Sequence, residues 1–571
     1  MLPASRLHLG KVGLAIALAA AALIPAPLLS GASAPARARQ GMVVTQDEIG
    51  SKVGFEVIRT GGNAIDAAVA TAFALAVTHP TAGNIGGGGF IVYRPASGQS
   101  VAYDFREKAP AAASPEMWLR DGKYDKERHH FSHRAVGVPG TVAGLHLAWK
   151  EHGTKPWREL LQPAIRLARD GFEVSHGLAR SLEGVLPQLR KYPASAAQFS
   201  KNGVPYAPGE ILRQPDLARS LERIAEQGPA GFYEGETARL IVEDMKANDG
   251  LITLADLKAY EARRRPVVTG TYRGYGIIGM LPPSSGGIAV IQTLNILEGY
   301  DLAANGPGSA RNVHLMAEAM RRVFADRARH VGDPDFNPEL PLARLISKEH
   351  AAELRRTINP AKASKSASDR FEWPYESQET THFSVVDAQR NAVALTYTLE
   401  YGYGSRIVVP GAGFLLNNEM GDFNAVPGLT DDTGLIGTRP NLAQPGKRML
   451  SSMSPTILTK DGQLFMVTGA MGGRTIINSV INTIVHAVDF GFNAQEAIDA
   501  PRMHHQWLPD RIAHERSAFS PDTLALLRSM GHTLFEVPSQ GIAEAIILNP
   551  KDGILEGGVD RRLPDGFAAG R

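Results

Sequence analysis

The sequence predicts an α+β protein in which paired strands form sheets and helices pack on those sheets. Two β-type runs, 380–386 and 392–398, flank a turn-like cluster and predict a β-hairpin. A helix is predicted at 64–77, where the residues are rich in alanine and almost wholly apolar, so their small side chains suit close packing on a sheet. Helical patterns then dominate 137–260.

The composition is that of a large globular protein. The chain has 571 residues, of which 43% are hydrophobic and 21% are charged. It contains no cysteine, which excludes disulfides, thiolate metal sites and a cysteine nucleophile. Residues 1–38 carry three basic residues and no acid, so their removal changes the net charge from +2 to −1. A near-neutral protein of this kind is not expected to have nucleic acid as its main partner.

Residues 1–38 are typical of a secretory signal peptide. Basic residues precede an apolar run at 12–24, and small-residue cleavage motifs end at Ala34 and at Ala38. The apolar run is too short for an ordinary membrane-spanning helix. We therefore expect a periplasmic or secreted protein whose mature chain begins near Arg39.

The first predicted helix, at 64–77, has Asn63 as a plausible N-cap, and a run of four glycines at 86–89 follows it. Consecutive glycines allow a ligand, another strand or the strand of a nearby nucleophile to approach the backbone closely. A phosphate-binding loop is the alternative, but the Lys-Ser/Thr ending of such loops is missing. Two paired strands are predicted next, at 90–93 and 101–105.

The middle of the chain predicts further elements but little chemistry. Residues 267–280 are strand-like, 288–298 are helical, and a helix at 310–330 carries charged residues expected to pair on its face. Residues 358–378 are polar and irregular, and we expect them to be exposed and mobile. Three neighbouring histidines at 129–133 lack partners at metal-ligand spacing, so no metal site is expected there.

The C-terminal part contains a loop and a glycine turn. Residues 424–447 are rich in Pro, Gly and Asp and would suit a lid. The strand ending near Met471 is followed by Gly472 and Gly473, and then by a helix that begins at Thr475. Backbone N–H groups in such a turn would suit an oxyanion hole, although the glycines would equally serve the turn alone.

Two features have the residue types that acyl-transfer chemistry needs. A threonine hydroxyl is a poor nucleophile unless a base lies beside it. A cut before Thr380 would free the α-amine of this residue, and that amine could serve as the base because its pKa of about 7.7–8.0 is close to the working pH. An ordinary strand start is the alternative, since threonine is common in strands. Arg106 follows a predicted strand. It would form either a surface or structural ion pair, or a fork that grips a substrate carboxylate.

From about residue 40 onward, the chain resembles the gamma-glutamyltransferase family, also called gamma-glutamyltranspeptidase or glutathione hydrolase. The segments that carry the resemblance are 104–107 (DFRE), 380–387 (TTHFSVVD), 416–420 (LNNEM), 450–456 (LSSMSPT) and 501–507 (PRMHHQW). The resemblance implies an N-terminal-nucleophile hydrolase fold, which is a four-layer αββα sandwich. It also implies self-cleavage into a large subunit, 39–379, and a small catalytic subunit, 380–571.

The same resemblance implies roles for individual residues. The cut would fall between Glu379 and Thr380, after which Thr380 is the nucleophile and Thr398 orients it. The oxyanion hole would consist of Gly472 and Gly473. The groups expected to hold the α-carboxylate of a γ-glutamyl substrate are Arg106, Ser451 and Ser452. Those expected to hold its α-amine, on the opposite side of this zwitterionic head, are Glu400, Glu419 and Asp422. No metal and no organic cofactor are implied.

Three positions depart from the family pattern. Several bacterial members have Asn at the position of Glu400, whereas others have Glu as here. Gly421 stands where an acidic neighbour of Asp422 is common. The aromatic residue that gates the pocket in some members corresponds to Thr433, which leaves the ratio of hydrolysis to transfer open.

The resemblance implies an enzyme that hydrolyses glutathione and other γ-glutamyl amides through a threonine acyl-enzyme, in a heterodimer of the two subunits. Water, an amino acid or a dipeptide would accept the γ-glutamyl group. An acylase of the same fold, acting on a glutaryl-type amide such as a β-lactam side chain, is the alternative; its substrate lacks the α-amine and would not need Glu419 and Asp422. A third hypothesis, an uncleaved binding or scaffold protein, would be expected to lose Thr380, Thr398 or the glycine pair.

Overall fold

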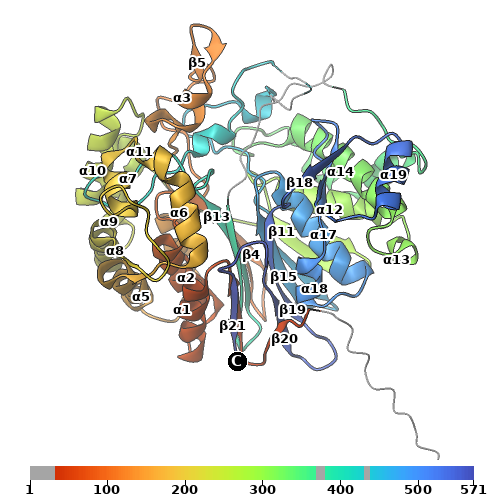
Figure 1. The fold of residues 1–571 in the computed structure, drawn as a ribbon, viewed down its shortest axis with the longest axis horizontal. Helices are drawn as coiled ribbons and strands as arrows, with labels where there is room; N and C mark the ends of the chain where they lie inside the picture. The colour runs from red at the N-terminus through yellow and green to blue at the C-terminus, as the bar shows by residue number, and fades with distance from the viewer. Residues whose placement is uncertain (1–32, 368–379, 430–431, 433–436) are drawn as a thin grey trace, which may run out of the picture. The chain divides into compact units, whose positions relative to one another are not determined.

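Two seven-stranded antiparallel sheets, stacked face to face, form the centre of the protein (Figure 1). The computed structural model describes residues 33–367, 380–429, 432 and 437–571. The first sheet has the order β1 (Ala36–Ala38), β20 (Leu555–Gly558), β19 (Ile542–Leu548), β15 (Gln463–Met471), β14 (Thr456–Lys460), β11 (Tyr275–Met280), β10 (Val267–Tyr272). The second has the order β21 (Phe567–Gly570), β2 (Met42–Thr45), β12 (Thr381–Val386), β13 (Ala392–Thr398), β3 (Gly88–Arg94), β4 (Val101–Asp104), β9 (Arg263–Arg265).

Helices cover the outer face of each sheet, so the chain forms the predicted four-layer αββα sandwich (Figure 1). The second sheet is covered directly by α1 (Glu48–Arg59), α2 (Ala64–Thr78) and α4 (Thr141–His152), with α5 (Trp157–Asp170) and α8 (Pro215–Gln227) packed outside them. The first sheet is covered by α12 (Gly286–Leu297), α17 (Thr475–Asp489) and α18 (Ala494–Asp499), with α14 (Ala310–His330) and α16 (Lys348–Arg356) packed on α12.

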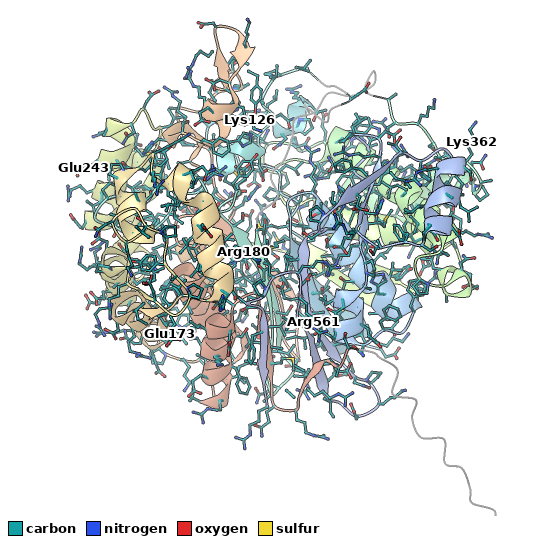
Figure 2. The ribbon with its side chains drawn as sticks, in the orientation of Figure 1. Lys126, Glu173, Arg180, Glu243, Lys362 and Arg561 are labelled. Atoms are coloured by element: carbon teal, nitrogen blue, oxygen red, sulfur yellow. The ribbon has the colours of Figure 1, made fainter. Side chains whose placement is uncertain are left out.

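Shorter elements complete the layers and their connections. The remaining helices are α3 (Lys126–His130), α6 (His176–Leu189), α7 (Pro193–Phe199), α9 (Ala230–Tyr233), α10 (Gly235–Ala247), α11 (Leu254–Lys258), α13 (Leu302–Asn305), α15 (Leu342–Leu345) and α19 (Pro521–Ser529). The 3₁₀ helices are η1 (His133–Ala135), η2 (Glu419–Asp422) and η3 (Arg439–Asn441). Small sheets contain β5 (Leu119–Arg120), β6 (Lys123–Tyr124), β7 (Phe172–Glu173), β8 (Ile211–Leu212), β16 (Met503–His504), β17 (Ile512–Glu515) and β18 (Leu534–Val537). Charged side chains such as Glu243 and Lys362 lie on the outer surface (Figure 2).

The predicted hairpin is confirmed, and it lies in the middle of the second sheet as β12 and β13. Val393, Leu395 and Tyr397 on one face of β13 belong to the core that contains α2. The smaller Ala392 and Ala394 on the other face belong to the core between the two sheets. A one-residue slip would exchange these faces, so burial on both sides fixes the register of the hairpin.

The glycine run at 86–89 lies against the backbone of β13. Gly88 pairs with Thr398 in the sheet, and a Cβ atom placed on Gly87 would overlap the carbonyl oxygen of Thr398. Of the predicted alternatives, the structure therefore shows the close approach of another strand, β13, to the glycine backbone. Gly88 and Gly89 begin β3, Gly86 and Gly87 lead into it, and the run does not form a phosphate-binding loop.

Helix limits agree well with local sequence signals, whereas two predicted segments differ. Asn63 caps α2 as predicted, through a reciprocal capping box with Asp66. Residues 267–280 form a hairpin of β10 and β11, and not one strand, because Arg273 and Gly274 have φ values of 51° and 79° that turn the chain.

The polar segment predicted to be exposed and mobile is largely exposed where it is described, but hydrogen bonds anchor it at Ser364 and Ser366. Glu318 of α14 accepts hydrogen bonds from the backbone and hydroxyl of Ser364, and Asp510 accepts one from the backbone of Ser366 at 2.8 Å. The later part of that segment, 368–379, lies outside the described residues.

The first described residues already belong to the fold. Strand β1 pairs with β20, and Ala38 is buried, in contact range of Gly570. The predicted signal peptide falls almost entirely on 1–32, outside the described residues, but its predicted end at 38 overlaps β1. Within the described part of the chain, no helix combines the length and hydropathy needed to cross a membrane.

We expect Gly87→Ala to lower the free energy of unfolding by about 1–3 kcal/mol, because the added methyl group has to displace the backbone of Thr398. Gly184→Ala is the matched control. Gly184 lies exposed in the interior of α6 with open space around its Cβ position, so this change should be neutral or stabilise by up to about 1 kcal/mol. Urea denaturation of both variants measures the difference, and equal midpoints would contradict the close approach.

Candidate functional site

One cavity of about 250 Å³ brings together residues from distant parts of the chain. It is lined by Arg106, Thr380, Thr398, Glu400, Glu419, Asp422, Ser451, Ser452, Met453, Gly473 and Ile476. Every site residue predicted from the sequence is in this lining except Gly472, which precedes Gly473 in the same turn.

The two predicted threonines lie level with each other at the open end of the hairpin. Thr381 pairs with Tyr397, so the next residues outward are Thr380 and Thr398. The Oγ1 atom of Thr398 accepts a hydrogen bond of 2.9 Å from the backbone N–H of Glu400. Asn84 donates a hydrogen bond of 2.9 Å to the carbonyl oxygen of Thr398. These contacts fix Thr398 beside Thr380.

His382 is close to Thr380 in sequence but points into the space between the two sheets. Its Nδ1 lies 2.8 Å from Oγ1 of Thr396 and its Nε2 lies 3.1 Å from Oγ of Ser384. Burial lowers the pKa of His382 to about 3, so the ring is neutral. It is not part of the cavity lining, and it is therefore not placed to act as a base for Thr380.

Arg106 is a fully buried cation surrounded by acids. It forms ion pairs with Glu419 and Asp422, and Glu107 lies 3.7 Å away. It also donates to the carbonyl oxygens of Met449 at 3.3 Å and of Leu450 at 3.2 Å. Arg106 is therefore not in a surface ion pair, but its buried pairs with Glu419 and Asp422 are structural ion pairs, which the predicted alternative also included. These contacts also correct the expectation that the cation and the acids stand on opposite sides of the site, because they touch.

Burial and charge together determine the protonation of this cluster. Burial opposes the charge of Arg106, but Glu419, Asp422 and Glu107 outweigh it and raise the pKa of Arg106, which stays charged. Burial raises the pKa of Glu419 and of Glu107, each to about 8, despite the attraction of Arg106. Once Glu419 ionises, its carboxylate and that of Asp422 exceed the single charge of Arg106 and leave capacity for a second cation. An α-amino acid head group, whose carboxylate and ammonium share one carbon, matches such adjacent partners.

The predicted serine pair is held by a residue that the sequence analysis did not single out. Arg327 of α14 donates to Oγ of Ser452 at 2.9 Å and to Oγ of Ser285 at 2.8 Å. Ser285 in turn donates from its backbone to the carbonyl oxygen of Ser451 at 2.7 Å. We expected Arg327 on an ion-paired helix face, but it is only 2% exposed. The available signal was its position three residues after Phe324, because this spacing places Arg327 on the same face of the helix as a buried aromatic residue.

The predicted glycine turn joins β15 to α17. Gly472 and Gly473 have φ values of 129° and 56°, and Gly473 reaches the cavity. The hydroxyl of Thr475 donates to the carbonyl oxygen of Gly472 at 2.7 Å. Gly541 packs against the turn, since a Cβ on Gly472 would lie 2.9 Å from its Cα. The turn is thus held from both sides.

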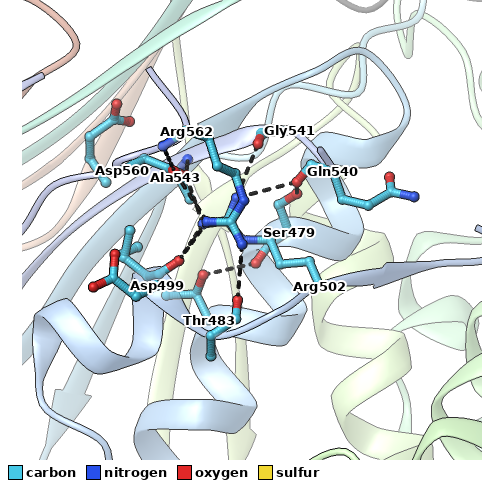
Figure 3. A network of polar contacts seen from close by, with 12 residues as sticks. Ser479, Thr483, Asp499, Arg502, Gln540, Gly541, Ala543, Asp560 and Arg562 are labelled. Carbon is cyan, nitrogen blue, oxygen red and sulfur yellow. Dashed lines mark hydrogen bonds and ion pairs between the residues drawn. The ribbon is translucent and has the colours of Figure 1, made fainter. Parts of the chain in front are cut away.

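A buried arginine network supports Gly541 (Figure 3). Arg502 donates to the carbonyl oxygens of Gln540 at 3.3 Å and Gly541 at 3.1 Å, and forms an ion pair of 2.7 Å with Asp560. Arg562 contacts Asp560 at 3.1 Å from the other side. The motif at 501–507 therefore acts at a distance from the cavity, by fixing the backbone on which the glycine turn rests.

Among the described residues, one group has the spacing of metal ligands: His314, Glu318 and His532. Its members already satisfy one another and their neighbours. Nδ1 of His314 lies 2.8 Å from Nε2 of His532, and Glu318 pairs with Arg321 and Arg322. A metal ion would have to displace two arginines from this carboxylate. His129, His130 and His133 are buried and do not form such a group.

The predicted lid at 424–447 is only partly described. Backbone hydrogen bonds join Asn424 to Asn441 at 2.9 Å and Gly428 to Gly437 at 3.0 Å, closing the base of the loop. Thr433 lies outside the described residues.

Comparison with known proteins places this chain. A family model described as gamma-glutamyltranspeptidase matches residues 50–570. The chain is 47% identical to the glutathione hydrolase proenzyme of Escherichia coli K12 over 96% of each sequence, and 39% identical to the acylase ACY 1 proenzyme of Pseudomonas sp. SE83 over 92% of each. Among solved structures, it is similar to the cephalosporin acylase from Bacillus halodurans, with a TM-score of 0.83, 27% identity and coverage of 96% of this chain and 98% of that one. It is also similar to the Helicobacter pylori gamma-glutamyltranspeptidase, with a TM-score of 0.55, 46% identity and coverage of 56% of this chain and 91% of that one. The chain therefore belongs to the gamma-glutamyltranspeptidase family.

Proposed function

We propose that this protein is a self-cleaving glutathione hydrolase and γ-glutamyltransferase that uses Thr380 as its nucleophile. The observation that carries the proposal is the joint position of Thr380 and the buried cluster of Arg106, Glu419 and Asp422 in one cavity. A reactive hydroxyl beside a site for a zwitterion suits amides whose acyl group is γ-glutamyl. The glutathione hydrolase proenzymes among the relatives support the same assignment.

Maturation would begin with attack by Oγ1 of Thr380 on the carbonyl carbon of Glu379. The peptide C–N bond breaks as the acyl group moves to oxygen, and the nitrogen of Thr380 becomes a primary amine. Water then hydrolyses the ester, which leaves a carboxylate on Glu379 and restores the hydroxyl. The products are a large subunit that ends at 379 and a small subunit, 380–571, which remain together as a heterodimer.

In turnover, the new α-amine of Thr380 would take the proton of its own hydroxyl as Oγ1 attacks the γ-carbonyl carbon of the donor. The N–H groups of the turn at Gly472 and Gly473 would stabilise the oxyanion. Collapse of the tetrahedral intermediate breaks the amide bond, and the leaving amine takes the proton. Water then releases glutamate from the acyl-enzyme, or an amino acid or dipeptide accepts the γ-glutamyl group.

Substrate binding would exchange ion pairs that already exist within the site. The donor carboxylate would take the guanidinium of Arg106 together with the hydroxyls of Ser451 and Ser452, while the donor ammonium takes Glu419, Asp422 and Glu400. Each charged group would leave one partner for another, so little charge is left uncompensated. Holding both charges of the head group positions the γ-carbonyl carbon for attack.

The second candidate is an acylase that acts on a glutaryl-type amide. It is favoured by the similarity to proteins named acylase ACY 1 and cephalosporin acylase. The acids around Arg106 favour a γ-glutamyl donor instead, because a glutaryl group brings no cation to them. Competition between a γ-glutamyl anilide and a glutaryl anilide decides between the two.

We further propose that the chain is exported, to the periplasm or the medium, after loss of a signal peptide. The sheet favours cleavage at the motif that ends at Ala34, because cleavage after Ala38 would remove β1 from its pairing with β20.

We expect Thr380→Ala to leave a single uncut polypeptide without amidase activity, because both the attacking hydroxyl and the threonine amine chemistry are lost. Thr381→Val is the matched control: Thr381 is the buried neighbour in β12, and this variant should still mature. A denaturing gel and a γ-glutamyl anilide assay measure both properties. Two bands from Thr380→Ala would contradict self-cleavage at the bond before Thr380.

We expect kcat/KM for a γ-glutamyl anilide to rise with pH up to about 8 with a logarithmic slope approaching 2. Two groups have to lose a proton: Glu419, whose pKa burial raises to about 8, and the Thr380 amine, with a pKa of about 7.7–8.0. Glu419→Gln removes the first group and should reduce the slope to about 1. Identical slopes in a pH series of both enzymes would exclude Glu419 from donor binding.

We expect the mature protein to retain residues 36–38, since these form an edge strand of the first sheet. N-terminal sequencing of exported protein should find a first residue at or before Pro35. A first residue at Arg39 would contradict the assignment of the cleavage motif.

A further inference from the structure

The space above Gly421 is filled by two side chains from other elements. A Cβ atom on Gly421 would overlap Nδ1 of His130 and would lie 2.7 Å from each carboxylate oxygen of Glu400. Gly421 belongs to η2, which also carries Glu419 and Asp422 of the cavity lining. A larger side chain at 421 is therefore incompatible with the present positions of His130 and Glu400.

His130 is built into this place by its surroundings. It is the last residue of α3, which packs on η2, and its side chain is 1% exposed. Its Nδ1 lies 3.2 Å from Oε1 of Glu400. The centroid of its ring lies 4.3 Å from that of His129 and 5.3 Å from that of Tyr401. Burial lowers the pKa of His130 to about 3, so the ring acts as a neutral neighbour of the carboxylate.

The backbone at position 400 makes the presence of glutamate informative. Glu400 has a φ of 80°, in the left-handed region that Asn adopts more readily than Glu, and the strain is of order 1 kcal/mol. The chain thus keeps a carboxylate at a position where the backbone favours an amide, and such strain is typical of functional sites.

We propose that positions 400 and 421 share room for a single carboxylate, which Glu400 fills because Gly421 leaves the space open, and that His130 positions this carboxylate toward the donor ammonium. His130 is thus a positioning residue for the ammonium contact that the proposed function gives to Glu400. This inference rests on the proposed γ-glutamyl activity.

A double-mutant cycle tests the exchange between positions 400 and 421. Glu400→Asn should raise KM for a γ-glutamyl anilide about 10-fold to 100-fold with a smaller change in kcat, as expected for loss of a charged hydrogen-bond partner. Gly421→Asp should also raise KM, because it displaces Glu400. The double variant should recover to within several-fold of the wild-type KM, since the aspartate introduced at position 421 then supplies the carboxylate. Effects that multiply in the double variant would overturn the exchange.

The role of His130 has its own matched variants. His130→Ala should raise KM several-fold but add nothing further in the Glu400→Asn background. His130→Asn, whose amide nitrogen takes the place of Nδ1, should restore the wild-type KM. His129→Ala is the control, because Nδ1 of His129 lies 3.1 Å from the hydroxyl of Tyr124, and this variant should raise KM less. Equal effects of His130→Ala with and without Glu400, or no rescue by His130→Asn, would exclude positioning through Glu400.

Failure of this inference is separate from failure of the proposed function. If the wild-type protein does not cleave a γ-glutamyl anilide, the proposed function fails. If the wild-type protein cleaves it and Glu400→Asn leaves KM unchanged, the inference fails while the proposed function stands. Competitive inhibition provides a second readout: Glu400→Asn should weaken L-glutamate, which has the ammonium, far more than glutarate, which lacks it.

Discussion

The ion cluster around Arg106 is the constraint on which the site depends. A guanidinium with no exposure to water is tolerable only when acids surround it, and Glu419, Asp422 and Glu107 do so. Their own burial makes two of these acids reluctant to ionise, so charge in the cluster is finely balanced. Such a cluster is a poor contributor to stability, and its retention in the core is best explained by a ligand that completes it.

The stacked sheets explain how this cluster meets a nucleophile. The hairpin of β12 and β13 is buried on both faces, which fixes its register and therefore the height of Thr380 relative to Thr398. The glycine turn approaches from the opposing sheet, at the end of β15. The Thr380 hydroxyl and the glycine turn thus belong to different sheets. The arginine network of Figure 3 helps to hold the glycine turn in place through Gly541.

Much of the fold followed from local patterns in the sequence, because caps, proline positions and alternation act over a few residues. Asn63 marked a helix start in this way, and the αββα sandwich followed from the family resemblance. What remained hidden depends on contacts between distant residues: the grip of Arg327 on Ser452, and the direct pairing of Arg106 with its acids. An arginine in an amphipathic helix is expected to be exposed to solvent unless the segment that packs against the helix is known.

The strand order has a mechanical consequence for a chain divided before Thr380. In the second sheet, β2 lies between β21 and β12, so an N-terminal strand is hydrogen-bonded on both edges by C-terminal ones. In the first sheet, β1 borders β20 at one end while β11 borders β14 further along. Strands of the two pieces would therefore be hydrogen-bonded to each other at several places in both sheets. Separating the pieces would break both sheets, so dissociation would require unfolding.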